Sequence, residues 1–146
     1  MIHEVDRRGF IASDDPDRID YAALHGFLTN SYWARGISLE LVEKSVRNSV
    51  SMGLYADHRM IGFARAVTDY ATFAYLGDVF VLEAWRGRGL GLFVSRCVVE
   101  HPRLQGLRRW ILSTHDAHGV YAKLGFGPLA DPSGIMTVHD PDIYRR

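Results

Sequence analysis

The sequence predicts a mixed α/β domain of the α+β type, built around a mainly antiparallel sheet flanked by helices. Two observations support this prediction. Between residues 50 and 67, apolar residues alternate along the chain on both sides of a short turn, which is typical of a β-hairpin. Between residues 90 and 98, they recur instead at the three- and four-residue spacing of a helix with one buried face. The chain has 146 residues, 47% of them apolar, so we expect a single domain over residues 1–146.

Before the hairpin, the chain is predicted to contain a short strand and two helices. The strand lies around Gly9–Ala12. The first helix follows it, with Asp15 as N-cap and Pro16 in the first helical position. The second helix begins after a Ser38 cap and has apolar residues at i, i+3 and i+7. The segment 29–37 is then the loop between the two helices.

The hairpin pairs residues 50–56 with residues 60–67 around a turn at residues 57–59. The returning strand is expected to bury one face that carries Ile61, Phe63 and Val67. Residues 73–81, FAYLGDVFV, have apolar side chains on both faces, which indicates a central strand of the sheet.

After the central strand, the pattern predicts a helix, a strand, a short helix and a final strand. The helix has its buried stripe from Leu90 to Val98. The next strand is RWILST, residues 109–114, and the short helix that follows ends at Gly125. The last strand is GIMTV, residues 134–138.

Charge and cysteine content narrow the classes of function. The chain carries 17 basic and 17 acidic residues, a balance that argues against a general nucleic-acid or anionic-membrane binder. Six of the arginines nevertheless fall between Arg86 and Arg109, where Glu100 is the one acidic residue. Cys97 is the only cysteine, so a disulfide within the chain or a cysteine-based zinc site is excluded. We expect a cytoplasmic protein without a signal peptide or membrane segment.

The segment Glu83–Gly91, EAWRGRGLG, lies between the central strand and a helix. Unpaired backbone N–H groups and the helix dipole make such a junction an anion site, and glycines let the backbone approach a phosphate closely. The pattern is neither GxxxxGK[ST] nor GxGxxG. It matches R-x-x-G-x-G over Arg86–Gly91.

This loop resembles the acetyl-CoA loop of the GNAT superfamily, the GCN-related N-acetyltransferases. VFVLEAWRGRGLG is similar to the family's strand–loop–helix signature, and the order of elements resembles the GNAT order along nearly the whole chain. DAHGVYAKLGFG resembles the family's helix with a tyrosine followed by K-x-G-F, which places Tyr121 in the position of the general acid.

The resemblance implies binding of acetyl-CoA by two stretches of backbone. The pyrophosphate would be held by the loop, and the pantetheine arm by hydrogen bonds along the preceding strand. The residues concerned are Val79, Phe80, Val81, Arg86, Gly87, Arg88, Gly89, Leu90 and Gly91. Thr114 stands where the family often has an asparagine that contacts the cofactor, and a threonine can keep one such hydrogen bond. A phenol at Tyr121 could protonate the leaving thiolate.

The sequence departs from the family at the general base. A carboxylate often projects from the strand at the positions of Tyr75 or Gly77, and neither residue can serve as a base. Strict alternation along a strand points the neighbouring Asp78 to the opposite face, where a structural role is favoured over a catalytic one. Glu83 begins the loop and faces solvent in the simplest interpretation. A water chain or a partly deprotonated substrate remains open as the base.

Two further groups lie near the predicted site. His115 and His118 lack an evident third partner for a metal ion, so a proton shuttle beside Tyr121 is the more reasonable functional role for one of them. Tyr32, Trp33 and Arg35 lie in the loop where the family often shapes its acceptor pocket, and aromatic residues there could cover an amine, but packing on the core is the favoured role.

The sequence therefore predicts an N-acetyltransferase that moves acetyl from acetyl-CoA to a primary amine, of a small molecule or a peptide, by direct attack. The alternative is a GNAT-fold module that binds acyl-CoA without turnover, as a sensor or an interaction domain. Nucleic-acid binding through the arginine-rich segment is a third hypothesis and predicts salt-dependent affinity. The acceptor is left open, and so is a homodimer formed through a strand near the C-terminus.

Overall fold

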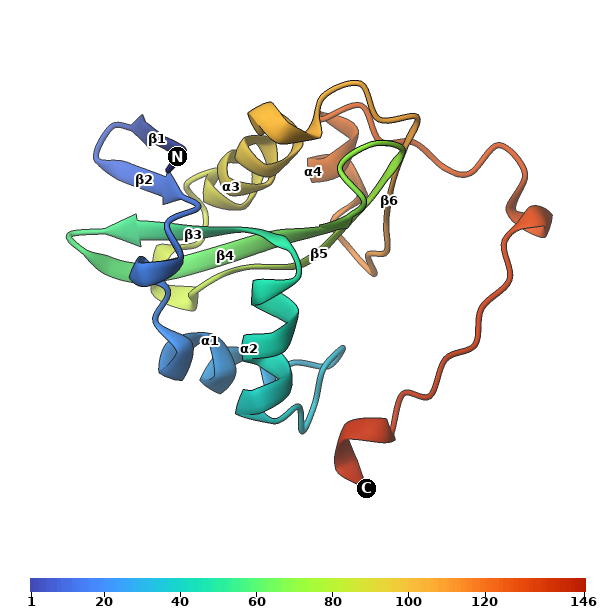
Figure 1. The fold of residues 1–146 in the computed structure, drawn as a ribbon, viewed down its shortest axis with the longest axis horizontal. Coiled ribbons are helices and arrows are strands. Elements are labelled where there is room, and N and C mark those ends of the chain that lie inside the picture. The colour runs from blue at the N-terminus through green and yellow to red at the C-terminus, as the bar shows by residue number, and fades with distance from the viewer.

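The fold is a six-stranded sheet in a computed structural model that describes residues 1–146 (Figure 1). The strands lie side by side in chain order, and all neighbours are antiparallel except β5 and β6, which are parallel. This confirms the mainly antiparallel mixed sheet. The strands are β1 (Glu4–Arg7), β2 (Phe10–Ser13), β3 (Val50–Ala56), β4 (Arg59–Thr68), β5 (Phe73–Val81) and β6 (Arg109–Leu112).

Helices cover both faces of the sheet and enclose two apolar cores (Figure 1). The helices are α1 (Tyr21–Leu28), α2 (Leu39–Arg47), α3 (Leu90–Val99) and α4 (His118–Ala122). The larger core, of 17 buried residues, lies between α3 and the sheet. The smaller core, of 10 buried residues, lies between the α1–α2 pair and the opposite face. None of the helices has the length and apolar character needed to cross a membrane.

The locally encoded elements appear where the sequence predicts them. The Ser38 hydroxyl accepts a hydrogen bond from the backbone N–H of Leu41 at 3.2 Å, which caps α2 as expected. The apolar stripe of α3 is buried against the sheet, and β5 is an internal strand between β4 and β6. The stripe includes Cys97, which is a buried free thiol.

Cys97 is expected to be unreactive in the folded protein. Burial raises the pKa of its thiol to about 11, and the thiolate, which is the reactive form, is therefore scarce at neutral pH. A chromogenic disulfide reagent should react with the native protein far more slowly than with the protein in denaturant. An equally fast reaction in both conditions would contradict the buried position.

The helix expected from Asp15 to Leu28 is wrong in its first half. Pro16–Arg18 form a short 3₁₀ turn capped by Asp15, and Ile19 then adopts an extended conformation. The α-helix begins at Tyr21, where the Asp20 carboxylate accepts from the N–H of Ala23 at 3.0 Å. Two capping aspartates five residues apart therefore begin two separate turns.

The strand expected around Gly9–Ala12 is one half of a second hairpin. It corresponds to β2, which pairs with β1 on one side and with β3 on the other. β1 has the sequence EVDR and is largely exposed, so it lacks the apolar alternation that reveals a strand.

The expected shared face on β4 is also wrong. The pairing of β3 with β4 shifts register at Leu54/Tyr55, and this irregularity inserts an extra residue into β4. As a result Ile61 packs in the α3-side core, whereas Phe63 packs in the α1–α2-side core.

The strand expected at residues 134–138 does not form. The chain after Gly127 contains only two short 3₁₀ turns, Pro132–Gly134 and Ile143–Arg145, and almost every residue in it is exposed. We call residues 128–146 the C-terminal arm. Figure 1 shows it running in a wide arc away from the sheet. Residues 134–138 have strand-forming side chains but no neighbouring strand with which to pair.

Candidate active site

The glycine loop presents a row of unused backbone donors. Gly87 and Gly89 adopt positive φ angles of 82° and 73°, and Gly89 is the N-cap of α3 without any side-chain cap. None of the six backbone N–H groups from Gly87 to Leu92 donates a hydrogen bond within the chain. Consecutive free N–H groups at the positive end of a helix dipole are suited to bind an anion, and binding of a pyrophosphate by this loop stays a prediction.

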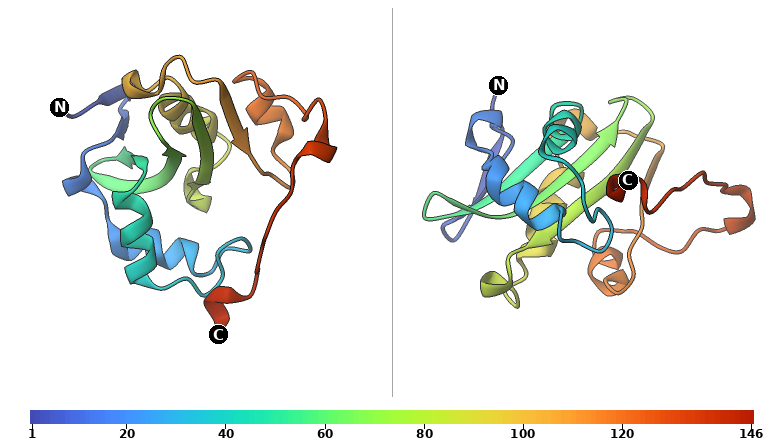
Figure 2. Two further views of the ribbon diagram at one scale, coloured as in Figure 1. Left: turned by 45° about the vertical axis from the view of Figure 1, so that its right-hand side comes forward. Right: turned by 90° about the horizontal axis from the view of Figure 1, so that it is seen from below.

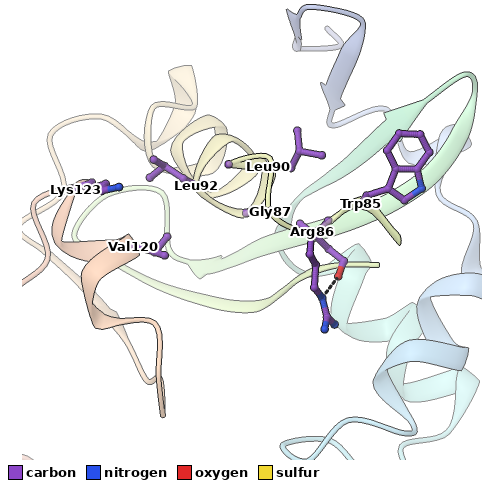
Figure 3. A pocket seen from close by; sticks show the side chains of 10 residues that line it. Trp85, Arg86, Gly87, Leu90, Leu92, Val120 and Lys123 are labelled. Atoms are coloured by element: carbon purple, nitrogen blue, oxygen red, sulfur yellow. Dashed lines mark hydrogen bonds between the residues drawn. The ribbon is translucent and has the colours of Figure 1, made fainter. Parts of the chain in front are cut away.

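A cavity of about 270 Å³ lies between this loop and α4. Figure 3 shows Val120 of α4 and Lys123, the residue that follows this helix, on one side of it and Trp85, Arg86 and Gly87 on the other. The Lys123 ammonium group gives the cavity a cation from a second element. Sequence analysis found Lys123 only as a letter of the K-x-G-F motif. Its position one turn of helix after Val120 could have suggested that both face the loop.

Arg86 connects the loop to the end of β5. Its Nε donates to the backbone carbonyl of Val81 at 3.0 Å, drawn as a dashed line in Figure 3. The guanidinium is thereby fixed at the rim of the cavity, and its other N–H groups form no hydrogen bond within the chain. Arg88 instead lies over the ring of Trp85, 5.1 Å from the ring centroid, and does not line the cavity.

The second half of β5 has one unpaired edge. β6 pairs only with Phe73–Leu76, so the stretch 77–81 has no neighbouring strand on its β6 side. Val79, Phe80 and Val81 lie on this stretch, where the sequence places the pantetheine track. An extended, unpaired backbone edge can accept a further extended chain through main-chain hydrogen bonds.

Tyr121 lies on α4 and packs against the larger core beside Phe126. Burial raises the pKa of its phenol. The nearby Ser95 hydroxyl opposes part of this rise, although the two groups form no hydrogen bond of normal geometry and Ser95 Oγ is buried without a partner. A phenol with a raised pKa stays protonated at neutral pH, which is the state that a general acid requires.

Thr114 has a local structural role at the start of α4. Its Oγ1 accepts a hydrogen bond from the N–H of Ala117 at 3.1 Å. The hydroxyl proton forms no hydrogen bond within the chain, so one donor remains for a ligand. The predicted contact of Thr114 with a cofactor stays a prediction.

Aromatic rings form a wall on the α1–α2 side of β5. Phe27 stacks on Phe80 with ring centroids 3.8 Å apart, and Trp33 packs against Phe27 at 6.0 Å. Tyr32, which is 62% exposed, contacts both Trp33 and His115 edge-to-face. The loop between α1 and α2 thus contacts the segment before α4. Its place at an acceptor pocket stays a prediction.

His115 and His118 are both exposed, and no group of three or more potential metal-binding side chains includes them. The ring of His115 lies 4.8 Å from the ring of Tyr32. Neither histidine forms a hydrogen bond with Tyr121, so the proton shuttle proposed for one of them stays a prediction.

Asp78 interrupts the alternation of β5, and the expectation that it points away from the Tyr75 and Gly77 face is wrong. The register between β4 and β5 shifts here, and Asp78 adopts a left-handed φ of 52°. This bulge turns the carboxylate toward the α1–α2 side. Arg65 Nε donates to Oδ2 at 2.7 Å, and Trp33 Nε1 donates to Oδ1 at 2.8 Å.

Both Asp78 oxygens therefore join β5 to its neighbours on the α1–α2 side. The side chains of Arg65 and Asp78 are only 19% and 12% exposed, and Arg65 also donates to the Ser49 hydroxyl. This carboxylate joins β4, β5 and the α1–α2 loop. The favoured structural role of Asp78 agrees with these contacts.

Asp78→Ala is expected to lower the free energy of unfolding by roughly 3 kcal/mol, because it leaves the Arg65 guanidinium largely buried without its partner. Glu43→Ala is the matched control, since it removes the Glu43–Arg47 pair on the exposed face of α2 and should cost less than about 1 kcal/mol. Urea unfolding curves of both variants test this. Similar small losses in the two variants would contradict the structural role of Asp78.

A comparison with protein families identifies this architecture. The model of the acetyltransferase (GNAT) family matches residues 25–126, which include the loop, β5, α3 and Tyr121. The chain belongs to the GNAT acetyltransferase family. Its GNAT fold confirms the family resemblance seen in the sequence.

Relatives of known structure or sequence agree. A candidate GNAT acetyltransferase from Xanthomonas campestris is 41% identical, with a TM-score of 0.89 over 100% of this chain and 98% of that one. A candidate acetyltransferase of Gibberella zeae is 27% identical over 90% of this chain and 87% of its own length. A candidate acetyltransferase of Clostridium acetobutylicum, crystallised with acetyl-CoA, has a similar fold, with 13% identity and a TM-score of 0.64 over 95% of this chain and 96% of that one.

Proposed function

We propose that this GNAT protein transfers an acetyl group from acetyl-CoA to a primary amine. The observation that carries the proposal is the row of six free backbone N–H groups from Gly87 to Leu92, opposite Lys123. A pyrophosphate needs several fixed donors and positive charge, and this loop supplies both without side-chain rearrangement. The acetyl-CoA in the Clostridium structure belongs to that protein, and its shared fold makes the same cosubstrate reasonable here.

Different residues of the chain would bind different parts of the cosubstrate. The loop Arg86–Gly91 and the Lys123 ammonium would hold the pyrophosphate. The unpaired edge of Val79–Val81 would bind the pantetheine arm. Acetyl-CoA supplies an activated thioester when bound, and in this proposal the Tyr121 hydroxyl would lie beside its sulfur.

In the reaction, the amine nitrogen forms a bond to the acetyl carbon and the carbon–sulfur bond breaks. The thiolate takes its proton from the Tyr121 hydroxyl, which solvent then reprotonates. The amine loses one proton in the same exchange. Asp78 is a poor candidate for accepting it because both of its oxygens already accept hydrogen bonds. Water, or an amine that arrives deprotonated, completes the proton balance.

Because both Asp78 oxygens accept hydrogen bonds, the chain has no evident general base beside β5. This favours the second candidate, a module that binds acyl-CoA without turnover. The two candidates differ in one measurement. Purified protein is mixed with acetyl-CoA and a panel of amines that includes polyamines, amino acids, amino sugars and peptides, and free thiol is followed with a chromogenic reagent. The proposal predicts amine-dependent thiol release with at least one class. Saturable acetyl-CoA binding without release for any amine would favour the module.

A further inference from the structure

Four basic side chains gather around the glycine loop and the beginning of α3. Arg86 and Lys123 line the cavity, and Arg88 belongs to the loop itself. The fourth is Arg7 of β1, whose Nη1 lies 3.8 Å from the position that a Cβ on Gly89 would occupy. None of the four pairs with a carboxylate within the chain.

This arrangement of charges is unfavourable in the protein alone. The beginning of α3 is the positive end of the helix dipole, and the backbone N–H groups from Gly87 to Leu92 are free there. Cations stabilise the last turn of a helix and destabilise the first, and like charges also repel one another. Four unpaired cations at this end therefore lower the stability of the protein, and a bound anion with several charges would offset that loss.

The β1–β2 hairpin places Arg7 beside the loop. Side chains alternate along β1, so Arg7 shares the α3-side face with Val5, which packs against the larger core. The guanidinium carbon of Arg7 lies 5.8 Å from the centroid of the Phe93 ring on α3. Figure 2 shows the hairpin on one side of α3 and α4 on the other. Arg7 and Lys123 therefore approach the loop from opposite sides of α3.

A second contact joins the hairpin to the loop. Phe10 of β2, the cross-strand partner of Arg7, packs edge-to-face against Trp85 with ring centroids 5.9 Å apart. The Arg88 guanidinium lies over the same Trp85 ring. Neither Arg7 nor Arg88 lines the cavity. These two residues, which we call the hairpin-side cations, are therefore a pair distinct from Arg86 and Lys123.

The cosubstrate of the proposed function carries phosphate in two places. Its pyrophosphate joins the pantetheine arm to the ribose, and a separate phosphate monoester is attached to the 3′ oxygen of that ribose. Such a monoester has a charge of about −1.5 to −2 at pH 7. Arg86, Lys123 and the free N–H groups are available for the pyrophosphate, which leaves the hairpin-side cations for the monoester. Arginine suits this role because its planar guanidinium donates two parallel hydrogen bonds to a phosphate.

We propose that Arg7 and Arg88 bind the 3′-phosphate of the cosubstrate, so that the N-terminal hairpin distinguishes CoA from its 3′-dephosphorylated form. The inference rests on the proposed function in its choice of cosubstrate. It concerns binding alone, so it holds equally for an enzyme and for a module that binds acyl-CoA without turnover.

Calorimetric titrations of the full-length chain with CoA and with 3′-dephospho-CoA test this assignment, because the two ligands differ only in the 3′-phosphate. The wild type should bind CoA about 10- to 100-fold more tightly, the usual effect of hydrogen bonds between charged groups. Arg7→Gln should bind CoA about 10-fold more weakly than the wild type and should bind 3′-dephospho-CoA equally well. Arg88→Gln should show the same selective loss.

Arg8→Gln is the matched control, because Arg8 is the neighbouring exposed arginine in the turn of the same hairpin. It removes the same charge and should keep the full preference for CoA. Equal affinity of the wild type for the two ligands, a full preference for CoA in Arg7→Gln, or an equal loss of affinity for both ligands in this variant would each overturn the proposal. A preference that depends on Arg7 in a protein that transfers no acetyl group would support the assignment while the proposed enzyme fails. Binding of neither ligand would remove both.

Discussion

Tyr121→Phe is expected to lower kcat by about 10²- to 10⁴-fold, the usual contribution of a general acid, and to leave the KM for acetyl-CoA nearly unchanged. The substitution removes the proton donor and keeps the ring that packs on the larger core beside Phe126. Steady-state thiol release with the best amine of the panel measures both constants. Tyr70→Phe, in an exposed turn, is the control and should retain full activity.

The pH dependence follows from the same residue. Because burial raises the pKa of Tyr121 above its usual value near 10, the folded enzyme keeps the protonated form to higher pH than a free tyrosine would. Ionisation of Tyr121 should therefore not lower the wild-type kcat between pH 7 and about 10. A kcat in Tyr121→Phe equal to that of the wild type would remove Tyr121 from the mechanism and leave the fold and the loop unaffected.

Gly89→Glu is expected to abolish the thermal stabilisation that acetyl-CoA gives to the wild type, with a loss of affinity on the order of 100-fold or more. Gly89 has a φ of 73° and caps the helix whose free N–H groups form the anion site. A side chain here strains the loop, and a carboxylate competes for the same donors as the pyrophosphate. A melting curve measured with and without acetyl-CoA shows whether the ligand still binds.

Gly106→Glu is the matched control for this loop variant. Gly106 has a similar φ of 79°, is exposed, and has nothing within 4 Å of a Cβ, in a turn before β6 and outside the cavity. Both variants should therefore lose about 1–2 kcal/mol of stability from the strained backbone. Only Gly89→Glu should lose the response to acetyl-CoA. An equal response in both variants would show that the loop does not hold the ligand.

Elements that depend on local sequence were predictable, because their signals lie within a few residues of one another. The Ser38 cap, the stripe of α3 and the alternation of β3 each identify an element without reference to the rest of the chain. The glycine loop was predictable for the same reason. Its conformation is set by Gly87 and Gly89 at positive φ and by the helix that follows.

Features that depend on pairing between strands were not predictable. The direction of the Asp78 carboxylate is set by a register shift between β4 and β5, and Ile61 and Phe63 are separated by a similar shift against β3. Neither register shift can be recognised from the local pattern of apolar residues in the sequence. Residues 134–138 show the reverse case, since they have a strand-like sequence but the single chain offers them no partner.

The sequence names candidate residues for binding a cofactor, but it reveals little of the contacts around the loop between α1 and α2. The loop, Val79–Val81 and Tyr121 follow from motifs, and the structure places the loop, Val81 and the neighbours of Tyr121 in the chain, Val120 and Lys123, around one cavity. The contacts of Trp33 with Asp78 and of Tyr32 with His115 join residues 45 or more positions apart. Such contacts arise from the tertiary fold, so no spacing in the sequence reports them.

The central claim is that the glycine loop holds the pyrophosphate of acetyl-CoA. A calorimetric titration of the wild-type protein with acetyl-CoA tests it most directly. The account predicts saturable binding of one molecule per chain, with a dissociation constant on the order of micromolar. The absence of saturable heat at millimolar ligand would contradict the claim, and the proposed acetyl transfer would have no cosubstrate site.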